Sequence, residues 1–163
     1  MKTVRIAALL FLAQVAAAQQ SSIDEWIAEA ETHVVPAADA MPEAKYSFAP
    51  VHGKFRGVRT FAEQVKHLAA NNYAMAAHIE GRKPSADEAS EEGPASVKTK
   101  AEILAYLKGS FAALHKAIAQ PNTANEKHDA TWYGVDAVAH SFNHYGQIVE
   151  YLRMNGIVPP ASR

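Results

Sequence analysis

Apolar side chains recur every three or four residues along four separate stretches of this 163-residue chain. That spacing places them on one side of an α-helix, which must bury that side against another element. Strand-like alternation is not convincing anywhere, and no internal repeat occurs. The sequence therefore predicts an all-α fold, a four-helix bundle with antiparallel helices. The residues predicted to face inward are Ile23, Trp26, Ile27, Ala30 and Val34; Phe61, Val65, Leu68, Asn72, Met75 and Ile79; Ile103, Leu107, Ser110, Phe111, Leu114 and Ile118; and Val135, Val138, Phe142, Tyr145, Val149 and Leu152.

Capping signals indicate where these helices begin and end. Thr60 with Glu63, and Thr99 with Glu102, have the spacing of a capping box at a helix N-terminus. Pro36 is expected to end or kink the first helix. The predicted helices cover about residues 22–35, 60–80, 99–120 and 130–155, with a long connection over 37–57 and an exposed, mobile loop over 81–97.

The start of the chain has the three parts of an export signal. Two basic residues lie within the first five, residues 6–15 form a short and mainly apolar core, and Ala16–Ala18 offers small side chains for cleavage. The apolar run is too short to remain as a stable membrane anchor. We therefore expect a signal peptide over residues 1–18, a mature domain over residues 19–163, and a periplasmic or secreted protein.

Charge and cysteine content narrow the possible functions. Lys and Arg number 16 against 17 Asp and Glu, and no basic run occurs, so nothing indicates a nucleic-acid partner. The chain has no cysteine, which excludes disulfides, a lipid anchor at the cleavage site and thiolate metal ligands. A transition metal would have to be bound by histidine and by carboxylate or amide oxygens.

A pair of histidines four residues apart marks the fourth helix. His140 and His144 would lie about 40° apart around a helix and roughly 6 Å apart along it. Both rings can then reach one metal ion, although the same spacing also suits a solvated or interfacial helix face. On the second helix, His67 lies on a polar stripe beside the apolar one. If these two helices are neighbours, the three histidines form a metal site with open coordination positions, suited to Zn, Ni, Cu or Fe.

Other polar side chains lie one or two turns from these histidines and are candidates for hydrogen bonds to the ligands or to a substrate. No carboxylate is seen within a turn of them on the same stripes, and Glu63 and Glu150 are expected to be surface charges. A general base is therefore missing, and no residue is assigned a catalytic role. The candidate neighbours are Gln64, Asn71, Tyr133, Gln147 and Tyr151.

Two segments resemble the DinB family of four-helix bundles, and in particular its small exported bacterial members. They are PEAKYSFAP followed by RTFAEQVKHLA, and later HSFNHYGQIVEYLRMNGIVPP. The resemblance covers about Trp26 to Pro160 and implies a bundle of the up-up-down-down type, with one divalent metal, zinc, nickel or iron, on His67, His140 and His144. It also implies frequent homodimers and, in some members, transfer reactions that use mycothiol, bacillithiol or glutathione.

Two functional hypotheses follow. The first is a metal-binding protein whose three-histidine site acts on an unknown small-molecule substrate, as a metal-dependent hydrolase or thiol transferase. The second is a non-catalytic, metal-binding or stress-related bundle that acts as a dimeric interaction protein through the other face of its fourth helix. A third possibility is that the bundle has an empty site and the histidines only pack. The fold alone does not choose among these possibilities.

Overall fold

The computed structural model describes residues 22–53, 57–120 and 128–163. Within these ranges the chain forms helices and no strands, which confirms the all-α prediction. The predicted signal peptide, residues 1–18, lies outside the described residues. The helices are an N-terminal helix over residues 22–40, α2 over Phe61–Ile79, α3 over Lys100–Ile118 and α4 over Ala130–Met154, with short 3-10 helices over Glu43–Lys45 and Pro160–Ser162.

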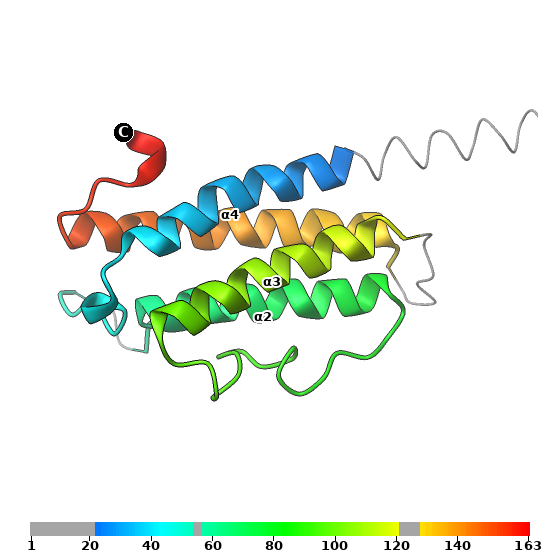
Figure 1. Ribbon diagram of the computed structural model, residues 1–163, viewed down its shortest axis with the longest axis horizontal. Helices are drawn as coiled ribbons and strands as arrows, with labels where there is room; N and C mark the ends of the chain where they lie inside the picture. The colour runs from blue at the N-terminus through cyan, green and yellow to red at the C-terminus, as the bar shows by residue number, and fades with distance from the viewer. Residues whose placement is uncertain (1–21, 54–56, 121–127) are drawn as a thin grey trace, which may run out of the picture.

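The four helices lie side by side, but not in the order of directions that the resemblance implied (Figure 1). The N-terminal helix and α2 run in opposite directions, α2 and α3 run in the same direction, and α4 runs back, giving an up-down-down-up bundle. Two observations confirm that α2 and α3 are parallel. Near their starts they line one pocket through Lys66 and Ile103, and further on Asn72 donates to Ser110 across 3.2 Å. Consequently, the 80–99 connection returns along the bundle, which explains its length.

The capping boxes predicted for α2 and α3 are present. The Thr60 side chain accepts a hydrogen bond from the Glu63 backbone N–H, and the Glu63 carboxylate accepts from the Thr60 backbone N–H. Thr99 and Glu102 make the same pair of bonds at the start of α3. These bonds satisfy backbone N–H groups that the first turn of a helix leaves without partners, so they fix where each helix begins. Asp129 caps α4 in a similar way, by accepting from the Trp132 backbone N–H.

The N-terminal helix differs from the prediction at both its end and its exposed face. It continues past Pro36 to residue 40, because Ala37 and Ala38 extend its apolar side and are fully buried. Trp26, predicted to be in the core, is 59% exposed. On α4 the buried face is likewise rotated from the predicted stripe, so that Val135 is 56% exposed.

Most of the remaining predicted core is buried, including every predicted inward-facing residue of α3. α2 supplies residues to both of its neighbours, α3 and α4. This position gives α2 one face for the apolar core and another for a polar seam with α4. No helix in the described ranges is both long and apolar enough to cross a membrane.

Candidate metal centre

The seam between α2 and α4 consists of polar side chains that face one another in a constant antiparallel register. Gln64 donates from Nε2 to Oε1 of Gln147 across 2.7 Å near one end. Near the other end, the ring of His78 stacks on Tyr133 with centroids 4.9 Å apart. In an antiparallel pair of helices, the numbers of facing residues add up to a constant. The sum is the same for Gln64 with Gln147 and for His78 with Tyr133, and His67 and His144 have this sum too, so they lie opposite each other.

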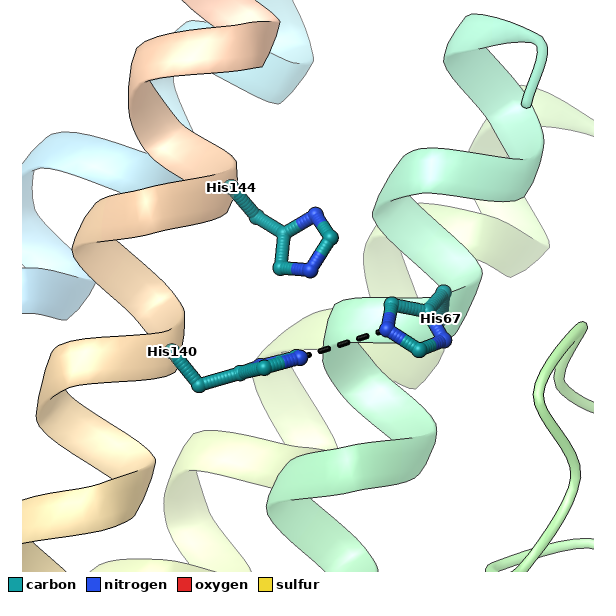
Figure 2. A group of neighbouring side chains, drawn as sticks. All are labelled: His67, His140 and His144. Carbon is teal, nitrogen blue, oxygen red and sulfur yellow. Dashed lines mark hydrogen bonds between the residues drawn. The ribbon is translucent and has the colours of Figure 1, made fainter. Parts of the chain in front are cut away.

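The three predicted ligands come together in the middle of this seam (Figure 2). The Nε2 atoms of His67 and His140 are 3.2 Å apart, and one ring nitrogen from each of the three histidines lies within 4.8 Å of the others. Two nitrogen ligands of a tetrahedral zinc ion, each about 2.0–2.1 Å from the metal, are about 3.4 Å apart. The spacing of His67 and His140 is therefore close to that of two ligands on one ion.

His67 is oriented by the connection between α2 and α3. Its Nδ1 lies 2.8 Å from the backbone carbonyl oxygen of Glu91, which can only accept a hydrogen bond. Nδ1 therefore carries the proton, and Nε2 keeps its lone pair toward the other two histidines. The turn that holds Glu91 lies directly on α2, because a Cβ atom at Gly93 would be 3.1 Å from the Lys66 carbonyl oxygen.

His144 is oriented by a chain of carboxamides. Its Nδ1 lies 2.8 Å from Oε1 of Gln64, and the Gln64 amide donates to Gln147. The Gln147 amide in turn lies 3.4 Å from Oδ1 of Asn143. As with His67, a proton on Nδ1 leaves Nε2 of His144 free to bind a metal. Of the predicted neighbours of the ligands, Gln64 and Gln147 take part in this way.

His140 has a different environment at Nδ1. This atom is buried and has no hydrogen-bond partner among the described residues, and the same is true of Oδ1 of Asn71. The register of the seam places Asn71 opposite His140. A neutral His140 that binds a metal through Nε2 carries a proton on Nδ1. No hydrogen bond joins this atom to Asn71 in the structure, and Asn71 is a candidate acceptor only through its place opposite His140 in the seam.

Burial keeps two of the imidazoles neutral, which is the form that binds metals. Desolvation, and then the neighbouring His67, lowers the pKa of His140 to about 4. Desolvation, followed by the charges of His140 and His67, lowers the pKa of His144 to about 3. At neutral pH both rings therefore offer lone pairs without first losing a proton.

The nearby acid that sequence analysis missed comes from the 80–99 connection. The carboxylate of Glu91 lies 3.4 Å from Nδ1 of His67 and 2.8 Å from the guanidinium of Arg59. No periodic pattern relates position 91 to the helices, so the sequence carried no signal for this contact. Of the two acids named from the sequence, Glu63 serves as the α2 cap and Glu150 pairs with Arg153 at the surface.

The other predicted neighbours and histidines lie outside the cluster. Tyr151 donates its hydroxyl proton to the Arg59 carbonyl oxygen across 2.9 Å, and Tyr133 stacks on His78. His33 pairs with Glu29, and His115 bridges Asp24 and Glu31 between α3 and the N-terminal helix. These contacts support the fold of the bundle rather than a site.

The cluster has the properties that a divalent transition metal requires. It offers three imidazole nitrogens at ligand spacing, two of them with the opposite ring nitrogen bonded to an oxygen acceptor. Two facing helices of this chain project these side chains inward. This arrangement is typical of helical bundles that bind a metal between their helices.

Comparison with known families agrees with this class. The family model of the DinB superfamily matches residues 27–148, a range that includes all three histidines, and the chain belongs to this superfamily. A comparison with curated proteins finds no match.

Proposed function

We propose that this protein binds one divalent transition metal, zinc, nickel or iron, through Nε2 of His67, His140 and His144. The observation that carries this proposal is the convergence of three ring nitrogens within 4.8 Å, at positions where two rings are held as neutral ligands. Three protein ligands leave at least one coordination position open, which is typical of a catalytic rather than a structural zinc site.

Such a metal, when bound, acts as a Lewis acid that can activate a water molecule or a thiol of a substrate. The residues of this chain would orient the ligands and place charges beside the metal. The Glu91 carbonyl holds His67 in the correct tautomer, Gln64 bonds to Nδ1 of His144, and the Arg59–Glu91 ion pair lies beside His67. We therefore propose a metal-dependent hydrolase or thiol transferase with a small-molecule substrate.

Elemental analysis of purified protein, set beside the His67→Ala and His140→Ala variants, tests this proposal. We expect about one equivalent of metal in the wild type and a loss in both variants. His78→Ala is the matched control, because it removes the same ring from the same helix outside the cluster and should keep its metal. A wild-type protein that takes up no zinc, nickel or iron, even after reloading, would refute the proposal.

A second candidate function is a non-catalytic metal-binding or stress-related bundle that acts as a dimer, and an exposed apolar patch favours the dimer. Trp26 on the N-terminal helix and Val135 on α4 are more than half exposed, and both line a pocket of about 290 Å³. The patch lies on the side of α4 that faces away from the buried histidines, where a second copy would cover it. Sedimentation of the wild type and Val135→Glu distinguishes a dimer through this face, which the variant would dissociate, from a monomer.

Export is also part of the proposal. It is supported by the basic start, apolar core and small-residue cleavage site within the first 18 residues. Expression of the full chain, followed by fractionation and mass measurement, should give a mature protein that begins at residue 19 outside the cytoplasm. A product of full mass in the cytoplasm would contradict this prediction.

A further inference from the structure

A surface pocket of about 400 Å³ lies beside the metal centre, between the outer face of α4 and the segment that precedes α2. Val58 and Pro50 form one wall, and Gly146 and Gln147 of α4 form the other. The Tyr151 hydroxyl bond to the Arg59 carbonyl ties the two walls together. Gln147 also belongs to the chain that orients His144, so this one side chain connects the pocket to a metal ligand.

The direction of every hydrogen bond in that chain is set by the tautomer of His144. A metal on Nε2 requires a proton on Nδ1, so His144 donates and Gln64 must present its oxygen. The Gln64 nitrogen then faces Gln147, which must also present its oxygen, as observed at 2.7 Å. As a result, the Gln147 nitrogen is directed away from Gln64 and donates to the Asn143 oxygen. The Asn143 carboxamide therefore also presents its oxygen to the chain and leaves its nitrogen outside it.

The carboxamide groups of Gln147 and Asn143 that have no partner within this chain are consequently N–H groups, which can only donate a hydrogen bond. Both oxygens are engaged within the chain, whereas Gln147 Nε2 has a second N–H and Asn143 Nδ2 has two. The remaining walls are apolar, and the one acid that lines the pocket, Glu150, pairs with Arg153. A ligand that fits this chemistry has a neutral hydrogen-bond acceptor, a carbonyl oxygen, on an apolar body.

We infer that this pocket binds small, neutral carbonyl compounds with an apolar group, of the ester, amide or ketone type, and that its affinity for them is coupled to the metal through Gln147, Gln64 and His144. The coupling part of this inference rests on the proposed metal site. Without a metal, His144 can hold its proton on either nitrogen, and the carboxamides can turn to present oxygens instead of N–H groups. With two equally populated orientations, the affinity of the metal-free protein would be about two-fold lower.

NMR titration of the protein with acetophenone tests the pocket, with ethylbenzene as the probe that lacks only the carbonyl oxygen. The side-chain amides of Gln147 and Asn143 report binding at the pocket itself. We expect acetophenone to bind the zinc-loaded protein about five-fold more tightly than ethylbenzene, the value of one neutral hydrogen bond. Zinc-loaded protein should bind acetophenone at least about two-fold more tightly than chelator-treated protein.

Three variants separate the pocket from the metal. Gly146→Leu should abolish binding of both probes, because no described heavy atom lies within 4 Å of its Cβ position and the new side chain occupies the pocket. Gln147→Glu keeps the acceptor for Gln64 but removes the N–H donors, so acetophenone should bind only as weakly as ethylbenzene. Gln64→Glu still accepts from His144 but cannot donate to Gln147, so the difference between loaded and metal-free protein should disappear.

Elemental analysis of every sample separates failure of this inference from failure of the metal site. A wild type with no metal refutes the proposed function and the coupling together. With metal present, the inference is overturned if acetophenone binds no better than ethylbenzene, if loaded and metal-free protein bind it equally, or if Gly146→Leu leaves binding unchanged.

Discussion

Lowering the pH should destabilise the metal-free protein through the two histidines of α4. The pKa values of His140 and His144 fall from an ordinary 6.5 to about 4 and about 3 in the folded protein, mainly because the rings are desolvated. The unfolded chain therefore binds protons that the folded one rejects. The stability from the two neutral rings is fully present above pH 6.5 and is lost as the pH falls toward 4 and 3.

The size of the effect follows from these pKa values. Between pH 7 and pH 5, each histidine should lower the free energy of unfolding by about 2 kcal/mol, or about 4 kcal/mol for both. A domain of this size is typically stable by about 5–15 kcal/mol, so the loss is a large fraction of the total. Replacing one ring, in His140→Gln or His144→Gln, should remove about half of the pH dependence.

Urea unfolding of chelator-treated protein at pH 7, 6 and 5, followed by circular dichroism, measures this difference. Gly134→Ala is the control, because it destabilises the fold without removing a titratable group, and it should keep the wild-type pH dependence. If the wild type and both α4 variants lost the same free energy between pH 7 and pH 5, the burial argument for neutral ligands would be wrong.

Three further predictions concern packing, the ligands and the caps. Gly134→Ala should destabilise the protein by about 1–3 kcal/mol, because its Cβ position is 2.6 Å from a side-chain methyl of the N-terminal helix. Gly146→Ala has open space at the Cβ position and should stabilise the helix by up to about 1 kcal/mol. Thermal unfolding of the two variants measures both effects. Asn71→Leu should weaken zinc binding about ten-fold or more if the Asn71 carboxamide accepts from His140 once the metal is bound. An unchanged affinity in competition with a chromophoric chelator would contradict that role. Thr99→Ala should cost about 1 kcal/mol of stability in urea unfolding while metal content stays the same.

The helices could be predicted because local signals define them. Apolar spacing gave the buried faces of α2 and α3, and the capping boxes at Thr60 and Thr99 fixed the starts of the same two helices. Local signals say less about how far a helix continues or which way the next one runs. Pro36 is a helix breaker by itself, but burial of Ala37 and Ala38 extends the helix past it. The parallel pairing of α2 and α3 depends on a connection whose sequence has no periodic pattern.

The candidate metal centre also has one part that local sequence signals predict and another that depends on the fold. The spacing of His140 and His144 is a property of one helix, so their convergence follows directly from the sequence. Bringing His67 to them required only that α2 and α4 be neighbours, which the structure shows. The Glu91 carbonyl, by contrast, reaches His67 from a connection that passes along α2, and its position depends on contacts such as that of Gly93 with Lys66.

The polar seam explains why the site and the core can share one helix. Leu68 of α2 is fully buried in the apolar core, while the adjacent His67 faces α4. Burying imidazoles and carboxamides destabilises a protein unless each polar atom finds a partner. Gln64 and Glu91 provide partners for two rings, but His140 Nδ1 and Asn71 Oδ1 are left without one among the described residues. The seam is therefore only partly stabilised by its own hydrogen bonds. A metal that binds only the folded state would stabilise the protein by mass action, although binding through Nε2 leaves those two atoms as they are.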